Sequence, residues 1–190
     1  MSAAPLPHSG CPVSRESVIL IPSIMSAGTL ISVEEYLHTT YRPDRDYIDG
    51  AVIERNVGEK DHSRLQTDLS TFLNVRAKQW NIAVFVEQRV QVKPRRFRVP
   101  DICVVAGPEP EEQIFRTPPL VCIEILSKDD RWSEVQERID DHLSFGVRHV
   151  WILDPRSRKA YDFTADGMHE VKELRAEQPE ISVPLQALFR

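Results

Sequence analysis

Two apolar runs separated by an amphipathic segment constrain the fold of this chain more than any other feature. The runs, 120–126 (LVCIEIL) and 149–154 (HVWILD), are short and nearly continuous, as is typical of buried strands. Between them, residues 130–145 repeat apolar side chains at helical spacing and end at Gly146. Such a crossover joins strands of one sheet in parallel. The pattern therefore predicts an α/β fold, with a mixed sheet flanked by helices.

Two further helices are predicted in the first half of the chain. Residues 31–41 begin with Ser32 and Glu35 at the spacing of a capping box. Residues 61–78 repeat leucine and phenylalanine at the i, i+4, i+7 and i+8 positions of one face. This second helix is the clearest in the sequence, and its apolar face is expected to pack on the sheet.

Strands are predicted where apolar runs are bounded by turn signals. The Asp49-Gly50 turn leads into one strand. A long strand over 82–92 is expected to pair as a hairpin with 98–106 around the turn KPRRF. We expect 158–163 at the edge of the sheet, and 181–189 as a last strand or docking segment.

Length and composition favour one globular domain with an N-terminal extension. The chain has 190 residues, of which 41% are hydrophobic and 28% charged. Residues 1–28 are expected to be disordered and 29–190 to form a single domain. The apolar run 18–25 is too short to span a bilayer, so no membrane partner and a cytoplasmic location are predicted. A signal peptide and a translation start at Met25 are the alternatives for this region.

Cysteine spacing and net charge exclude two classes of protein. Cys11, Cys103 and Cys122 lack CxxC spacing, so a zinc site is not expected. Cys103 and Cys122 lie in apolar runs and are interpreted as core residues in a reducing compartment. The formal net charge of −5 argues against a protein that coats nucleic acid, although it permits a local basic groove.

Two acidic residues stand in strand-like surroundings where burial is expected. Asp101 follows Pro100 in the run RVPDICVV, and Glu124 lies inside VCIEIL. An ionised carboxylate buried without a partner is costly, so such residues are paired, protonated or bound to a metal. Oxygen ligands without histidine or cysteine favour Mg²⁺ or Mn²⁺. The alternative is that Asp101 caps a turn and Glu124 pairs with an arginine at the end of the sheet.

An ordered set of segments resembles the Uma2 family of restriction endonuclease-like proteins. The segments are YIDGAVIE, a helix from Asp61-His62, RVPDICVV, VCIEILSKDDR and GVRHVWILDP, and they span about 31–163. The resemblance implies a restriction-endonuclease-like core of the PD-(D/E)xK type and a metal-dependent endonuclease that hydrolyses DNA. It also implies that Asp101 and Glu124 hold Mg²⁺ or Mn²⁺.

The resemblance also leads us to expect a further acidic ligand and a homodimer. An acidic residue of the first segments adds a contact, with Asp46, Asp49 and Glu54 as alternatives. A homodimer is expected by analogy, because cutting both strands of a duplex usually needs two active sites.

The catalytic lysine of the nuclease pattern is displaced in this chain. Leu126 stands at the usual position, and the helix position where the family carries lysine aligns with Arg138. Lys128, one pleat beyond Leu126, and Arg138 are therefore the candidate catalytic cations. Lysine can orient or deprotonate water, whereas arginine supplies charge only. A solvated surface cation is the alternative for each.

This displacement keeps two other functions open. One is a nuclease-fold protein that has lost turnover and binds nucleic acid or a protein partner. The other is an α/β domain with no role in nucleic-acid binding, in keeping with its acidic composition.

The only concentration of basic residues immediately precedes Asp101. We expect Arg95, Arg96 and Arg98 to contact phosphates without reading bases, with a solvated hairpin tip as the alternative. His62 is interpreted as a helix residue that packs or, alternatively, lines the cleft and contacts nucleic acid. His142 is interpreted as a packing residue.

Overall fold

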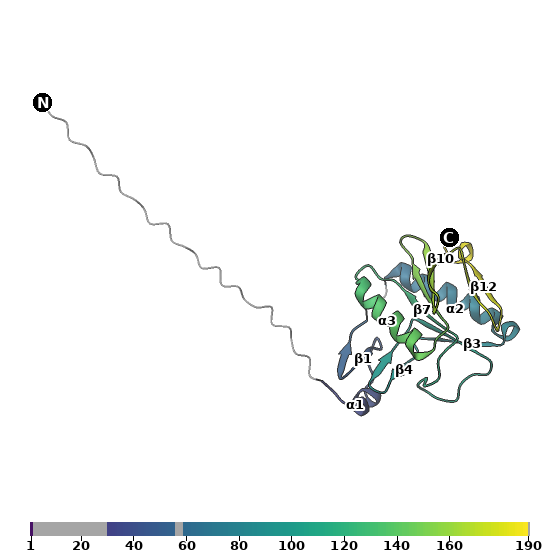
Figure 1. Cartoon of the computed structure of the whole chain (residues 1–190), viewed down its shortest axis with the longest axis horizontal. Helices are drawn as coiled ribbons and strands as arrows, with labels where there is room; N and C mark the ends of the chain where they lie inside the picture. The colour runs from purple at the N-terminus through teal and green to yellow at the C-terminus, as the bar shows by residue number, and fades with distance from the viewer. Residues whose placement is uncertain (2–29, 56–58, 190) are drawn as a thin grey trace.

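A computed structural model describes Met1, residues 30–55 and residues 59–189 (Figure 1). The predictions made for residues 2–28, including the extension, the signal peptide, the start at Met25 and Cys11, fall outside these residues. None of the helices in the described residues is long and apolar enough to cross a membrane.

A six-stranded mixed sheet carries the predicted crossover. Its order is β10-β9-β8-β7-β6-β3, and only β7 and β8 are parallel among its neighbours. The helix between them, α3 (Trp132–Phe145), ends at Gly146, whose φ of +107° suits glycine. The α/β fold with a mixed sheet is confirmed. The strands are β3 (Ile82–Val86), β6 (Ile102–Ala106), β7 (Val121–Ile125), β8 (His149–Asp154), β9 (Lys159–Thr164) and β10 (Gly167–Val171).

Helices cover both faces of this sheet (Figure 1). The long helix α2 (Lys60–Trp80) packs Leu65, Leu69 and Leu73 against one face. On the other face, α3 packs Val135 and Ile139 against apolar side chains that alternate with the first set. The alternation along each strand thus decides which of its residues face α2 and which face α3.

A second, four-stranded sheet stands beside the first and is covered by α1 (Val33–His38). Its order is β2-β1-β5-β4, all antiparallel. Tyr36, Tyr47 and Phe97 form its fully buried aromatic core. The Ser32 hydroxyl accepts a hydrogen bond of 3.0 Å from the Glu35 amide and caps α1 as predicted. The strands are β1 (Asp46–Ile48), β2 (Ala51–Ile53), β4 (Val90–Lys93) and β5 (Arg96–Arg98).

The predicted pairing of 82–92 with 98–106 is confirmed, since β3 pairs with β6 and β4 with β5, but neither segment is one continuous strand because both change sheets. Residues 82–92 divide into β3 and β4, and 98–106 divide into β5 and β6. The first division lies at Glu87, whose φ of +51° turns the chain out of the large sheet. The second includes Pro100, which lacks an N–H. The Glu87 amide donates to the Asp101 carbonyl at 3.2 Å, so the two crossings lie side by side.

The C-terminal part differs from expectation at one point. The segment predicted as an edge strand, β9, lies between β8 and β10, and β10 forms the edge. The expected last strand is present as β12 (Ile181–Pro184), paired with β11 (Glu173–Ala176) and followed by α4 (Leu185–Leu188). This hairpin adds Leu174 and Val183 to the core beneath α2.

Candidate active site

Asp101 and Glu124 lie opposite each other on adjacent antiparallel segments. The register of β6 and β7 pairs Ile102 with Ile123, so one further step places Asp101 across from Glu124. Residues opposite each other in such a pair have Cα atoms about 4.5–5.5 Å apart and project to the same face. The Ile125 amide donates a 2.7 Å hydrogen bond to Asp101 Oδ2 across the same gap. The fold thus brings the two predicted carboxylates together.

Asp101 is 3% exposed and is held by cations from two segments. Arg55, which follows β2, forms an ion pair with Oδ1, and His62 Nε2 in the first turn of α2 lies 3.3 Å from Oδ2. Burial acts to raise the pKa of the Asp101 carboxyl, but the His62 hydrogen bond and the Arg55 charge outweigh it and lower the pKa. Burial also acts to lower the pKa of His62, and the contact with Asp101 raises it. Asp101 is therefore held ionised.

Glu124 is 4% exposed and receives its counter-charge from α3. Arg138 Nε lies 3.2 Å from one carboxylate oxygen, and His142 Nε2 lies 3.3 Å from the other. Arg138 also reaches Asp130 at 3.3 Å. Burial acts to lower the pKa of Arg138, but the charges of Glu124 and Asp130 raise it above its usual range. Arg138 therefore stays positively charged. Its contact with Glu124 agrees with the alternative that Glu124 pairs with an arginine.

His142 is completely buried, and its contact with Glu124 was not predicted. Its Nδ1 has no hydrogen-bond partner among the described residues. With a proton on Nε2, the imidazole donates to Glu124 Oε1, which lies 3.3 Å away. His142 therefore packs, as expected, and also orients a carboxylate.

The two carboxylates open into a cavity of about 250 Å³ between the two sheets and the starts of α2 and α3. The charged residues that line it are Asp46, Glu54, Arg55, His62, Arg98, Asp101, Glu124, Asp130, Glu134, Glu137 and Arg138. Within residues 30–55 and 59–189, no three His, Cys, Asp or Glu side chains are grouped to hold a metal. Two adjacent carboxylates still fit Mg²⁺ or Mn²⁺, because Mg²⁺ commonly takes one or two carboxylates plus water and phosphate oxygens.

The two candidate cations occupy different places. Arg138 lines the cavity and contacts Glu124. Lys128 was predicted one pleat beyond Leu126, on the strand face of Glu124, but β7 ends at Ile125, so this placement is wrong. Lys128 lies in the following turn, with 62% of its side chain exposed and an ion pair of 3.1 Å to Glu59. It is not among the residues that line the cavity.

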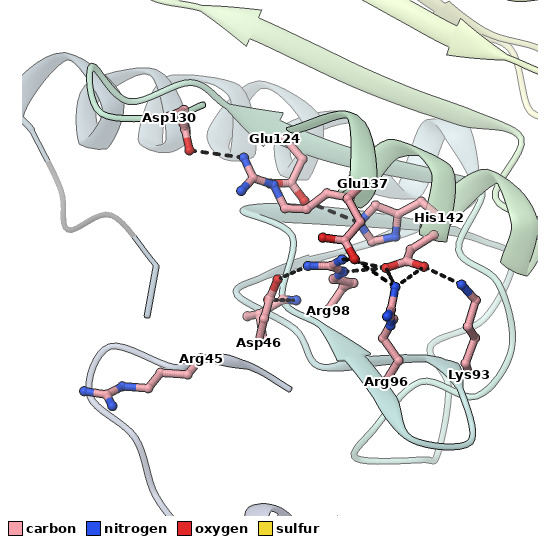
Figure 2. A network of polar contacts seen from close by, with 12 residues as sticks. Arg45, Asp46, Lys93, Arg96, Arg98, Glu124, Asp130, Glu137 and His142 are labelled. Carbon is pink, nitrogen blue, oxygen red and sulfur yellow. Dashed lines mark hydrogen bonds and ion pairs between the residues drawn. The ribbon is translucent and has the colours of Figure 1, made fainter. Parts of the chain in front are cut away.

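Most basic side chains of the segment before Asp101 form ion pairs with acidic residues of the same protein. Arg98 is 3% exposed and bridges Asp46 at 2.9 Å and Asp141 at 2.6 Å. Arg96 and Lys93 also bind Asp141, at 3.2 and 2.7 Å. Figure 2 shows Lys93, Arg96 and Arg98 reaching from the small sheet toward α3. These contacts join the small sheet to α3, whereas Arg95 is exposed.

The three acidic residues proposed as a further ligand also lie in different surroundings. Asp46 lines the cavity, but its oxygens accept from Arg98 and from the Val99 amide. Glu54 lines the cavity and pairs at 2.8 Å with the partly exposed Arg45, which Figure 2 shows apart from Lys93 and Arg96. Asp49 pairs with Arg96 and is not among the residues that line the cavity.

Three residues of the site carry no recognisable signal in the sequence. Arg55 follows a short strand, and Asp141 and His142 stand on an ordinary amphipathic helix. Their roles depend on contacts over long sequence separations, such as Arg55 with Asp101 and His142 with Glu124. The only available hint is that Asp141 and His142 adjoin the buried stripe of α3, where a polar residue needs a partner.

Comparison with known proteins agrees with this arrangement. The model of the Uma2 family, described as "Putative restriction endonuclease", matches residues 33–190. A crystal structure of a "putative nuclease belonging to DUF820" from Anabaena variabilis ATCC 29413 has a similar fold, with a TM-score of 0.71 and 24% identity. The similarity covers 84% of this chain and 97% of that one. The comparison with curated proteins gave no match. The match of the family model over most of the chain shows that this protein belongs to the Uma2 family.

Proposed function

We propose that this protein is a metal-dependent endonuclease that hydrolyses phosphodiester bonds of DNA. The observation that carries the proposal is the pair of buried acidic residues, Asp101 and Glu124, that line one cavity. A pair of buried acids stabilises nothing by itself, since an apolar pair would pack at less cost. Membership of a family described as restriction endonucleases, and the fold of a nuclease-like relative, support the same function.

In this proposal Asp101 and Glu124 hold Mg²⁺ or Mn²⁺. When bound, the metal lowers the pKa of a water molecule and neutralises charge that develops on the phosphate. Arg138 holds Glu124 in place and presents a fixed positive charge at the cavity wall. It cannot take a proton from water, because guanidinium stays charged. His142 keeps the second Glu124 oxygen oriented, and His62 does the same for Asp101.

The proposed DNA substrate is supported by exposed cations next to the cavity rather than inside it. Lys60, Lys128 and Arg131 have 93%, 62% and 81% of their side chains exposed. Their ion pairs with neighbouring acids are solvent-exposed and therefore weak, so phosphates can replace those acids. A second cavity of about 750 Å³ is lined by Lys60 and Arg158 and uses the same first turn of α2 that carries His62. We place the DNA backbone along this surface, and we propose a homodimer for double-strand cleavage.

A cleavage assay tests the proposal. Linear and plasmid DNA are incubated with the full chain in Mg²⁺, in Mn²⁺ and in a chelator. Cleavage in metal that is lost in the chelator, and lost in D101N and E124Q, is the expected result. Lack of cleavage by the folded wild-type protein with both metals and both substrates would reject the enzymatic function.

One observation favours a second candidate, a protein that binds DNA without cutting it. Each carboxylate already carries an arginine, and no lysine is among the described residues that line the cavity. Salt-dependent DNA binding in the absence of any metal-dependent cleavage would select this candidate over the first.

A further inference from the structure

Arg55 is bound differently from the other arginines of the site. Asp101 is the only residue in the described part of the chain with which Arg55 forms a hydrogen bond or ion pair. Arg138, by contrast, is held between Glu124 and Asp130, and Arg98 between Asp46 and Asp141. Guanidinium has five N–H donors, so a single acidic partner leaves most of them free for other acceptors.

The position of Arg55 coincides with the position that a metal on Asp101 would need. Asp101 Oδ2 already accepts from the Ile125 amide at 2.7 Å and lies 3.3 Å from His62 Nε2. Oδ1 is the oxygen that Arg55 contacts. A divalent ion shared with Glu124 therefore approaches through the side of Asp101 that Arg55 occupies.

Arg55 and a metal also satisfy the same electrostatic requirement. A carboxylate that is 3% exposed needs a counter-charge, and either cation provides it. With both present, the positive charges of Arg55 and the ion repel each other across one carboxylate. Arg55 lines the cavity, and its side chain is 17% exposed, so it has a route to solvent.

We propose that Arg55 is an internal counter-cation that occupies Asp101 in the metal-free protein and withdraws when a divalent ion binds. Arg55 then sets the metal affinity of the site, because binding energy is spent on displacing it. The inference rests on the proposed metal site and adds a residue that controls its occupancy. It requires no change in the ligands, Asp101 and Glu124.

Calorimetric titration of the full chain with Mn²⁺ tests the inference. R55Q removes the charge and keeps a polar side chain, and we expect it to bind Mn²⁺ about tenfold more tightly than wild type, within the usual range for coupled sites. R116Q is the control, since Arg116 is exposed, hydrogen-bonds to Gln91 and does not line the cavity. Its affinity should stay at the wild-type value. Unchanged or weaker binding by R55Q overturns the inference.

Two further results separate this inference from the proposed function. If wild type binds Mn²⁺ and D101N does not, while R55Q equals wild type, the inference fails and the metal site stands. If neither wild type nor R55Q binds Mn²⁺, both fail.

A measurement on the wild-type protein keeps the test decisive if R55Q does not fold. The Arg55 Nε–H signal in a ¹⁵N NMR spectrum, assigned with R55K, is followed during titration with Mg²⁺. We expect this signal to shift as the ion saturates the site, together with the backbone amide of Ile125, which reports on Asp101. Movement of the Ile125 signal without any change at Arg55 overturns the inference.

Discussion

Asp101 and Glu124 are buried, and each contacts a guanidinium and an imidazole. Arg55 and His62 supply these groups to Asp101, and Arg138 and His142 supply them to Glu124. Burial alone would favour neutral carboxyl groups. The lowered pKa of Asp101 shows that its partners outweigh burial. Four basic side chains thus surround the two acids that we propose as metal ligands.

Substitution of the two candidate cations should give different results. R138Q removes the charge beside Glu124, and we expect DNA cleavage to fall about a hundredfold or more, as for loss of one electrostatic contact in a transition state. R138K keeps the charge and should retain more activity than R138Q. K128A should stay within about threefold of wild type, because exposed ion pairs contribute little.

Cleavage rates at saturating DNA and Mg²⁺ distinguish these variants, with thermal unfolding as the control for folding. A loss of activity in K128A as large as that in R138Q would show that the catalytic cation is Lys128.

At the scale of secondary structure, the site is built where two strands change sheets. The crossover of β7, α3 and β8 was predictable, because apolar runs and helical spacing record which faces are buried. The division of 82–92 was not, because the polar residues 87–89 that separate its two apolar parts include no glycine or proline to mark a turn. The turn depends on the positive φ of Glu87, and a glutamate in the sequence does not predict a positive φ. Sequence patterns report burial, whereas the choice between two adjacent sheets depends on tertiary contacts.

Glycine at position 87 should stabilise the protein. Glu87 is exposed and has a φ of +51°, which costs a non-glycine residue roughly 1 kcal/mol or more. We expect E87G to raise the free energy of unfolding by about 0.5–1 kcal/mol, after allowing for the flexibility of glycine in the unfolded chain. Urea unfolding measures this change. E111G is the control, because Glu111 is exposed without a positive φ, and it should be neutral or destabilising. Equal destabilisation by the two variants would contradict the role of the turn.

Asp141 should be a main link between α3 and the small sheet. Its carboxylate is buried and receives Lys93, Arg96 and Arg98, so D141N leaves buried positive charge with a neutral partner. We expect a loss of about 3–5 kcal/mol in the free energy of unfolding at pH 7. The measurement is urea unfolding of D141N and wild type. A loss below about 1 kcal/mol would mean that these contacts stabilise the protein no more than ordinary surface ion pairs do.

The same pair of proteins has a defined pH dependence. Burial acts to raise the pKa of Asp141, but the hydrogen bonds from Lys93 and Arg98 outweigh it and lower the pKa. The contribution of Asp141 is therefore complete above its unfolded pKa of about 3.9 and is lost as the pH falls through the lower, folded pKa. The difference between wild type and D141N should be constant from about pH 5 to pH 7 and shrink below about pH 4. A difference that grows toward acid pH would contradict this sign.

At the scale of the whole molecule, the exposed positive charge does not come from the segment that is most basic in the sequence. The densest basic segment, 93–98, lies largely inside ion pairs, while exposed cations come from separate elements such as the start of α2 and the β8–β9 turn. The apolar surroundings of the two carboxylates pointed to burial, and the family resemblance pointed to Arg138; all three line one cavity. The sequence could not identify Arg55 or the exposed cations near the cavity, because their proximity depends on how distant segments pack.

DNA binding should therefore depend on Lys60 and Arg158 and not on basic residues at the opposite end of β8. We expect the double variant K60Q/R158Q to bind DNA more weakly and to reduce the slope of log affinity against log salt by about 2, roughly one for each phosphate contact. R148Q is the matched control, because Arg148 is exposed at the opposite end of β8. Fluorescence anisotropy over a range of NaCl concentrations measures the slopes. Equal slopes for R148Q and the double variant would place the DNA elsewhere.

The central claim is that Asp101 and Glu124 bind one divalent ion. Anomalous diffraction from crystals grown with Mn²⁺ tests it most directly, because the signal locates the metal independently of its effect on activity. We predict a single strong peak between the two carboxylates, within about 2.0–2.3 Å of an oxygen from each, as expected for a divalent ion of this type. A peak only at other residues, or no peak in a crystal saturated with Mn²⁺, would contradict it.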